Sequence, residues 1–434
     1  MKMTRDHRLI YLIKKSIPLL ALVSSAASAD QMHYRNVITG ERAQGLGGAY
    51  TGVADDASGV FYNPGGLAFA QSNDISGSAN AFYSKKVTFK KAFLGVSDFV
   101  EESGGTFAPF FGVMQKLDKY LPGLVGGFAY YTLDTELKDQ DNLKSYGALQ
   151  RFHRAANIRA ATFAATGALG YRISPSMGIG LSLGYIKADE LTQVSQNSIV
   201  GVYTDPSTGQ QKGPVYQVLS LRESLIAHGA QLGFGVQWAP SAQLSVGATV
   251  RSGSYASQKY SQVVDNVKVD AGVIDALPAT ATSDNPLGSM PLELRAGIAW
   301  FASPRLLVTS DIDFHEEVSD TSSITENLYS RESVTNFALG TEYYMTASIP
   351  FRLGFFTNYD ATPTPTTSKK GQADHIDYMG TSMFLAWAQP NSQISAGIVV
   401  QKGTGKSQKS SIDTALQDVE SLAYTLGFSA THSF

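Results

Sequence analysis

The stretch LAYTLGFSATHSF, residues Leu422 to Phe434, decides the fold class. Its apolar and aromatic residues alternate with small and polar ones, and its last residue is aromatic. Successive side chains of a β-strand point to opposite faces, so this alternation predicts a strand with one apolar and one polar face. Such a strand suits a barrel wall with lipid outside and a polar lumen inside, although a strand of a soluble sandwich can show the same pattern.

The same alternation recurs upstream and predicts an all-β chain of about fourteen strands, an even number as in single-chain bacterial barrels. Each predicted strand has at least about the 9–11 residues that a tilted strand needs to cross a bilayer. The strands are expected near 73–83, 106–116, 122–134, 156–173, 176–190, 226–239, 242–256, 290–302, 305–316, 333–347, 349–360, 375–389, 392–402 and 421–434.

The predicted connections fall into two classes that alternate along the chain. The short ones each contain a proline, which stops a ladder and favours a turn. The long ones are rich in Ser, Thr, Asp, Lys and Gln and are expected near 84–105, 135–155, 191–225, 257–289, 317–332, 361–374 and 403–420. Short turns at one end and long polar loops at the other are typical of outer-membrane barrels. A soluble sandwich has no reason to sort its loops in this way.

The tryptophans support the same interpretation. Trp238, Trp300 and Trp387 each lie two to four residues before a proline turn, at the short-turn end of a predicted strand. An aromatic girdle at one membrane interface would have this placement. The alternative is that they are ordinary core residues.

Charged side chains fall on the face opposite the apolar one and are therefore expected in the lumen. Arg251, Arg295 and Arg352 are candidates to bind the carboxylate head group of a ligand, because arginine can hold a carboxylate through two hydrogen bonds. The alternative is that they pair with lumenal acids such as Glu293, Asp311 and Glu342.

Aromatic side chains are predicted on the lumenal face as well. Phe356, Tyr378 and Phe384 fall on this face and are further candidates for ligand contact. A lumen that holds both aromatic and charged groups is not a plain aqueous pore.

Residues 1–29 have the pattern of a secretory signal peptide. A positively charged start is followed by the short apolar run 16–26 and by the cleavage motif Ala27-Ser28-Ala29, so we expect the mature chain to begin at Asp30. The chain has no cysteine, which excludes disulfides, thiolate metal sites and a lipid anchor on a cysteine. The net charge of −3 gives no basic surface for nucleic acid.

The segment between the signal peptide and the first predicted strand, residues 30–72, is expected to form a plug, or hatch, inside the barrel 73–434. A barrel this wide needs something inside it if it is not to be an open channel. The stretch ERAQGLGGAYTGVADDASGVFYNPGGLAF, residues 41–69, contains seven glycines and the Asn63-Pro64-Gly65 turn signal. Glycines permit tight turns and close backbone approach to the wall.

This stretch resembles the N-terminal hatch of the FadL/TodX family, the outer-membrane transporters of long-chain fatty acids and other hydrophobic compounds. Residues 54–57, Ala-Asp-Asp-Ala, and Asn63-Pro64 match the family pattern, whereas Gly65 replaces the usual alanine. FAPFFG (107–112), MPLELRAGIAW (290–300) and FRLGFFTNYDATPTP (351–365) with ADHIDYMGTSM (373–383) are similar to later family segments. The likeness covers essentially the whole mature chain.

The resemblance implies a fourteen-stranded antiparallel transmembrane barrel in the bacterial outer membrane, present as a monomer among outer-membrane lipids. It also implies a route in which a hydrophobic ligand enters from the extracellular loops, occupies a lumenal pocket and leaves sideways through the wall. Asp55, Asp56, Asn63, Pro64 and Gly65 are then hatch or gating residues.

The third strand is the expected place of the wall opening. Gly126 and Gly127 lie next to each other in this strand and could break its ladder. The alternative is that the two glycines only accommodate packing against the hatch.

Enzyme chemistry is not expected from this sequence. Asp55 and Asp56 could form a catalytic pair, but adjacent residues seldom converge on one site, and polar ties to the wall explain them better. No G-x-S-x-G elbow is found, and the histidines lack metal-ligand spacing, so no catalytic residue, metal or cofactor is expected.

Two functions remain in competition. The first is uptake of long-chain fatty acids or similar hydrophobic compounds, and the second is a FadL-like barrel that serves as a surface-protein shuttle or secretion component. A general porin is disfavoured by the plug.

Overall fold

The computed structural model describes residues 32–93, 97–146, 149–204, 211–270, 273–283, 290–319, 330–369, 372–408 and 415–434. The predicted signal peptide therefore lies outside the described residues. Within the described ranges, short helices occur before the first strand, at α2 (Glu41–Gly45), α3 (Gly59–Tyr62) and the 3₁₀ helix η1 (Gly66–Phe69). No helix in the described ranges is long and apolar enough to cross a membrane.

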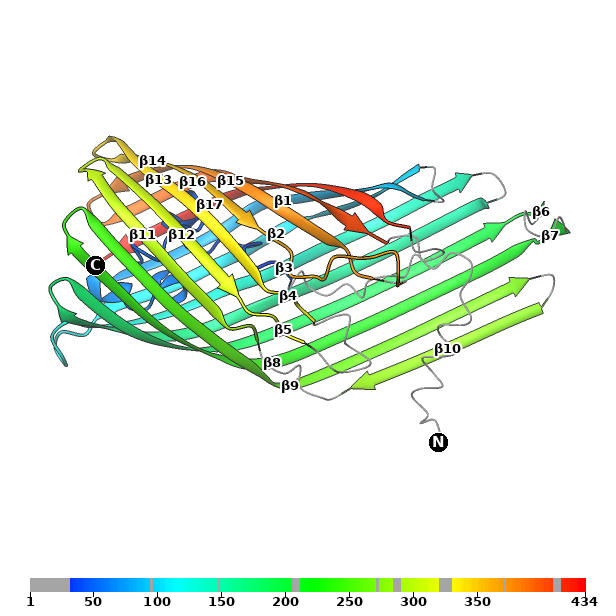
Figure 1. Cartoon of the computed structure of the whole chain (residues 1–434), viewed down its shortest axis with the longest axis horizontal. Coiled ribbons are helices and arrows are strands. Elements are labelled where there is room, and N and C mark those ends of the chain that lie inside the picture. The colour runs from blue at the N-terminus through cyan, green and yellow to red at the C-terminus, as the bar shows by residue number, and fades with distance from the viewer. Residues whose placement is uncertain are drawn as a thin grey trace.

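Fourteen long antiparallel strands of the described chain close into a barrel (Figure 1). Each strand pairs with its sequence neighbours, and β17 pairs with β1 to complete the ring. The predicted fold class is confirmed. The barrel strands are β1 (Asp74–Phe93), β2 (Ser97–Lys116), β3 (Leu124–Tyr146), β4 (Leu149–Ser174), β5 (Met177–Val200), β8 (Val215–Ser241), β9 (Leu244–Asp270), β11 (Glu293–Ser303), β12 (Leu306–His315), β13 (Val334–Thr346), β14 (Ile349–Asn358), β15 (His375–Gln389), β16 (Ser392–Ser407) and β17 (Gln417–Ser433).

The wall is much taller on one side than on the other. Strands β3 to β5, β8 and β9 have 23 to 27 residues, whereas β11 to β14 have 10 to 13. The additional strand β10 (Val273–Ser283) pairs with the far end of β9, and the short hairpin β6 (Tyr203–Thr204) and β7 (Gln211–Lys212) follows β5. Figure 1 shows these long strands continuing well past the short ones.

The prediction of long polar loops at 84–105, 135–155, 191–225 and 257–289 was therefore largely wrong. Most described residues of these ranges continue the strands. The outward face of the wall is polar there, as Gln193, Ser195 and Asn197 show, while Val194 and Gln196 are buried on the inward face. The alternation of burial thus persists where the alternation of hydrophobicity fades.

Near the short turns, the side chains of the wall lie on the faces that the sequence predicted. On β17 the aromatic and aliphatic residues Phe428, Leu426 and Tyr424 are exposed, and Ser429 is buried on the lumenal side. Trp238, Trp300 and Trp387 are all more than half exposed, near the short turns. They point away from the lumen, as a girdle requires.

Residues 32–73 lie inside this barrel and provide much of its core. The main apolar cluster joins hatch residues such as Leu46, Tyr50 and Leu67 to inward side chains of the wall, including Phe110 and Tyr131. All five are nearly or fully buried. The lumen is therefore filled at the short-turn end.

Candidate functional site

The turn around Asn63 brings the hatch backbone into contact with the wall. A Cβ on Gly65 would lie 2.7 Å from the Gly235 carbonyl oxygen of β8, and a Cβ on Gly180 of β5 would collide with Pro64. Cβ contacts this short do not occur, so glycine is needed on both surfaces. The departure from alanine at Gly65 thus goes with a very close approach of the hatch to the barrel.

Asn63 ties this turn to the hatch and to the wall at once. Its fully buried amide nitrogen donates to the Thr51 and Val236 carbonyl oxygens, each at 3.0 Å. Its amide oxygen accepts from the Gly65 N–H at 3.0 Å. The side chain therefore satisfies backbone groups of both parts of the molecule.

We expect Asn63→Ala to loosen this turn without opening the barrel. Buried polar groups left without partners cost about 1–3 kcal/mol each, so the Gly65 amide should exchange its hydrogen at least about tenfold faster. Hydrogen exchange followed by mass spectrometry measures this, with Asn391→Ala in an exposed turn as the control. Unchanged exchange at Gly65 would show that the turn is held by packing alone.

A buried charge cluster anchors helix α2. Arg352 of β14, which is 1% exposed, forms ion pairs with Glu41 of the hatch and, at 2.6 Å, with Glu342 of β13. Arg42 of the hatch binds the same Glu342 at 2.8 Å, and Gln393 donates to Glu41 at 2.6 Å. Two acids and two arginines thus hold the first hatch helix against three strands.

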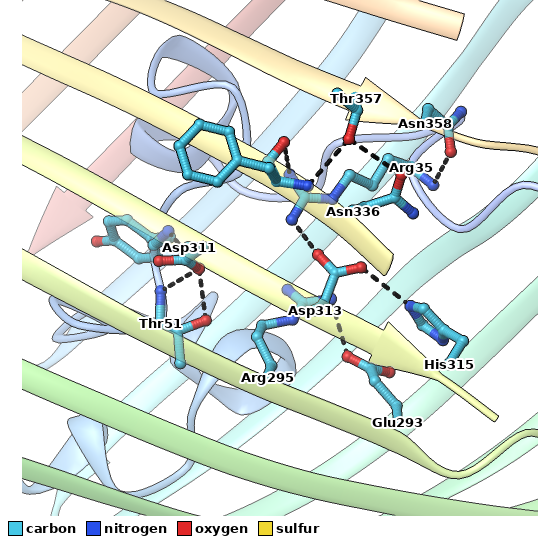
Figure 2. A network of polar contacts seen from close by, with 12 residues as sticks. Arg35, Thr51, Glu293, Arg295, Asp311, Asp313, His315, Asn336, Thr357 and Asn358 are labelled. Atoms are coloured by element: carbon cyan, nitrogen blue, oxygen red, sulfur yellow. Dashed lines mark hydrogen bonds and ion pairs between the residues drawn. The ribbon is translucent and has the colours of Figure 1, made fainter. Parts of the chain in front are cut away.

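A second cluster, shown in Figure 2, holds the chain before and after α2. Arg35 forms an ion pair with Asp313 of β12, whose other carboxylate oxygen lies 3.1 Å from His315 Nε2. Asp311, two residues before Asp313 on the same face of β12, accepts from the Thr51 N–H at 2.9 Å and from the Thr51 hydroxyl at 2.6 Å. Both aspartates of β12 therefore bind residues of the hatch.

Asp55 and Asp56 belong to the local structure of the hatch. Asp56 accepts from the Tyr50 hydroxyl at 2.9 Å and from the Ser58 N–H at 2.8 Å, which shapes the turn before α3. Asp55 lies 3.4 Å from Arg42. Burial raises the pKa of the Asp55 carboxyl, and the positive charge of Arg42 opposes that shift. Their gating role stays a prediction.

The three candidate arginines of the lumen all have protein partners. Arg251 and Arg295 bind Glu293 at 3.0 and 2.8 Å, and both guanidinium groups lie over the Phe61 ring of the hatch, at 4.6 and 5.4 Å. Arg352 is occupied as described above. Ligand contact by these arginines stays a prediction, and their burial against the hatch favours the structural role that sequence reasoning gave as the alternative.

The three candidate aromatic residues are inward and buried, but the structure spreads them over separate places. Phe356 packs with Ile38 and Ala49 of the hatch, while Phe384 lies under Gly427. Tyr378 lies near the long-loop end, where the Lys85 ammonium is 5.4 Å from its ring centre. Of the three, Tyr378 lines the cavity described below.

The first described residues of the hatch reach the opposite end of the barrel from the short turns. The Met32 carbonyl oxygen accepts from the Ala361 N–H at 2.9 Å, and His33 Nε2 lies 2.7 Å from the Ile376 carbonyl oxygen. Asn36 donates to Asp134 of β3 at 3.0 Å. Residues 32–38 thus form an irregular segment, here called the strap, that runs along the lumen and reaches the long-loop side.

The wall itself is interrupted between β2 and β3. The ladder runs from Lys116 and Val125 to Phe110 and Tyr131, and beyond it Ser103 and Lys138 form one further pair. No pairs join 104–109 to 132–137 within the described stretch 97–146, although both strands stay paired with their outer neighbours. Gly104, Gly105 and Pro109 lie in the interrupted part of β2, and proline removes a ladder donor.

A small cavity, partly open to solvent and with room for about one water molecule, lies beside this break. Thr135 and Glu136 of the unpaired part of β3 line it, together with Asn36 and Val37 of the strap. The rest of its lining is Tyr83, Lys85, Tyr378, Gln401 and Ala423. The cavity therefore touches the hatch on one side and the interruption of the wall on the other.

The ladder is continuous at the predicted lateral-opening residues. Gly126 pairs with Gln115 and Leu169, and Gly127 pairs with Met114 and Ala168. A Cβ on Gly127 would lie 2.7 Å from Val60 of α3, which is the packing alternative raised from the sequence. The interruption lies five residues further along the same strand, and Pro109 was the sequence signal that could have located it.

Metal chemistry finds no support in the described residues. No group of three or more His, Asp or Glu side chains there is placed to hold a metal ion. Sequence reasoning missed the strap residue Arg35 and its acceptor Asp313, since nothing in the sequence indicates which acid a lumenal arginine meets.

A closed antiparallel barrel with a lumenal plug and an interrupted wall defines the molecule as a bacterial outer-membrane, multi-pass channel protein. Residues 20–434 match the family model described as outer membrane protein transport protein (OMPP1/FadL/TodX), so the chain belongs to that family. The family consists of outer-membrane channels and transporters for hydrophobic compounds. A search of curated proteins gave no match.

Solved structures share the fold at low sequence identity. A Pseudomonas aeruginosa FadL homologue is 13% identical, with 93% of this chain and 100% of that chain covered and a TM-score of 0.62. The Pseudomonas putida toluene transporter TodX is 14% identical, with 91% and 98% covered and a TM-score of 0.61. The monoaromatic hydrocarbon channel CymD is 15% identical, with 92% and 99% covered and a TM-score of 0.57.

Proposed function

We propose that this protein takes up long-chain fatty acids or similar hydrophobic compounds and releases them sideways through the interruption between β2 and β3. The observation that carries the proposal is the cavity that joins the strap 32–38 to the unpaired residues of β3. A lateral exit keeps an apolar chain out of water, which is worth about 0.8 kcal/mol per CH₂ group.

The anchors of the hatch favour this route over passage straight through the barrel. Helix α2 and the turn at Asn63 are tied to the wall by buried ion pairs and backbone hydrogen bonds. The strap is tied to the wall as well, by the Arg35–Asp313 ion pair and by the hydrogen bond from Asn36 to Asp134, and it borders the cavity. A ligand that enters from the long-loop end meets the strap first and reaches the cavity by breaking these ties, while α2 and the Asn63 turn stay in place.

Uptake by cells that lack their own transporter tests the proposed ligand class. Cells that produce this protein should take up a labelled long-chain fatty acid in preference to toluene, because Lys85, Gln401 and Asn36 give the cavity polar groups for a head group. Barrel levels in the membrane are matched by heat-modifiable gel mobility. Preference for toluene would assign the protein to monoaromatic compounds, and no uptake of either would favour the interaction-protein alternative.

A further inference from the structure

The tall side of the barrel carries an unusual set of charges on its outer surface. Arg159 of β4, Arg222 of β8 and Lys259 of β9 are exposed and point away from the lumen, and Lys187 of β5 lies among them. We propose that these four residues, here called the outer cationic patch, bind phosphate groups of outer-leaflet lipids. This inference does not depend on which ligand the channel carries.

The register places the patch on neighbouring strands in successive rows. Phe163, Lys187, His228 and Ser257 form one row across β4, β5, β8 and β9. We count outward-facing rows from this one toward the long-loop end of the barrel. Lys259 lies in the second row, Arg159 in the third and Arg222 in the fourth. Successive outward rows are two residues, about 6.6 Å, apart along the strands, so the four cations spread over about 20 Å and face several lipid head groups.

The height of the patch matches the head-group region. Trp238 marks the short-turn interface on β8. A strand tilted by about 40° climbs about 2.5 Å per residue, so an apolar band about 25 Å tall takes about ten residues and ends near His228. Below this level the outward residues of β8 are apolar, with Leu232 65% and Phe234 42% exposed. The patch begins where this apolar band stops.

Aromatic residues at the same level mark the second interface. Tyr185 is 51% exposed, and its hydroxyl lies 2.5 Å from His228 Nδ1. Tyr130 is 41% exposed and stacks on Phe163, with ring centres 5.8 Å apart. Amphipathic rings of this kind lie at the head-group level of membranes.

The charge of the patch is not neutralised by the protein. Of the nearest outward carboxylates, Asp189 pairs with Lys187 at 2.8 Å. The exposed Asp139 of β3 and Asp265 of β9 form no ion pair with the described cations of the patch. Arg159, Arg222 and Lys259 form no ion pair with any described residue. Arginine binds phosphate through paired hydrogen bonds, and each cation near an anionic membrane surface adds to attraction.

The opposite side of the barrel offers the contrast that makes this pattern informative. On the outside of β1, β2, β16 and β17 three lysines have acidic partners, although the exposed Lys402 has none among the described residues: Lys86 binds Glu102 at 3.0 Å, and Lys406 binds Asp418 at 2.5 Å. Lys90 likewise binds Glu420, at 3.1 Å. Extended strands on this side thus carry mostly balanced charge, whereas the β4–β9 side keeps an excess of positive charge.

Native mass spectrometry of the purified barrel tests the proposal. The probes are bisphosphorylated lipid A and the same lipid without phosphates. The patch variant is Arg159→Gln/Arg222→Gln/Lys259→Gln, and the matched control Lys86→Gln/Lys90→Gln/Lys406→Gln removes the same number of outward cations from the other side. Heat-modifiable gel mobility confirms that both variants are folded barrels.

We expect the wild type and the control variant to prefer the phosphorylated lipid, and the patch variant to bind it at least about tenfold more weakly. Binding of the lipid without phosphates should be equal for all three proteins. The proposal is overturned if the patch and control variants bind the phosphorylated lipid equally, or if the wild type does not distinguish the two lipids.

Discussion

A disulfide across the interruption between β2 and β3 should stop transport. Ser103 pairs with Lys138 above the interruption and Phe110 with Tyr131 below it, in one continuous register, so Thr106 lies opposite Thr135. Cβ atoms joined by a disulfide are about 3.8 Å apart, which is closer than directly paired strand residues usually are. Formation of the bond in Thr106→Cys/Thr135→Cys therefore draws the two strands together and closes the route.

The expected result is a fall in ligand uptake of at least about tenfold under oxidising conditions, as for a pore closed at its constriction, with recovery on reduction. The chain has no cysteine of its own, so the engineered pair is the only one available. Ala155→Cys/Ser195→Cys joins two outward residues of the continuous β4–β5 ladder and serves as the control. Full uptake by a variant whose disulfide is shown complete by mass spectrometry would place the exit elsewhere.

This test addresses the part of the structure that the sequence indicated least. The sequence suggested an opening at Gly126 and Gly127, because glycine weakens a strand. Those glycines pair normally with the neighbouring strands. They leave room for the hatch, since Val60 occupies the space that a side chain at Gly127 would need. The interruption depends instead on how two segments fail to meet, which is a property of both strands together, and Pro109 is its one local sign in the sequence.

The barrel was predictable where burial and hydrophobicity agree. In the lipid belt the outward residues must be apolar, so the alternation in β17 or β11 identifies strand and face at once. Beyond the lipid belt, toward the long-loop end, both faces of a strand can be polar. Val194, Gln196 and Ser198 of β5 are buried inward, yet their polar neighbours gave the stretch the composition of a loop. Backbone pairing continues there without a hydrophobic signal.

The hatch likewise has features that the sequence predicts and features that it does not. Its position was predictable from glycine content and turn signals, because a compact segment before the first strand must fill a wide lumen. Its anchors were not, since Arg35 and Asp313 are separated by 278 residues and any lumenal acid could have met that arginine. Ion pairs of this kind follow from the packed structure, and so does the finding that the candidate ligand-binding arginines hold the hatch.

Removal of the Arg352 charge should release the first hatch helix. The side chain is buried between Glu41 and Glu342, and loss of one partner of a buried ion pair costs about 3–5 kcal/mol because a charge remains without compensation. Arg352→Met keeps an unbranched side chain against Gly45, so the loss is mainly electrostatic. The β13–β14 ladder is formed by backbone pairs and should survive.

We therefore expect Arg352→Met to form a folded barrel with a larger and noisier ion conductance in planar bilayers, and with faster protease cleavage between Gly40 and Gly52. Lys406→Met, which breaks an exposed pair with Asp418, should conduct like the wild type. Arg352→Met/Glu41→Gln removes the uncompensated charge, because Glu342 keeps its ion pair with Arg42, and should recover part of the closed state. If the double variant leaks as much as the single one, the hatch is held by the shape of the arginine side chain, and the charge cluster is not its anchor.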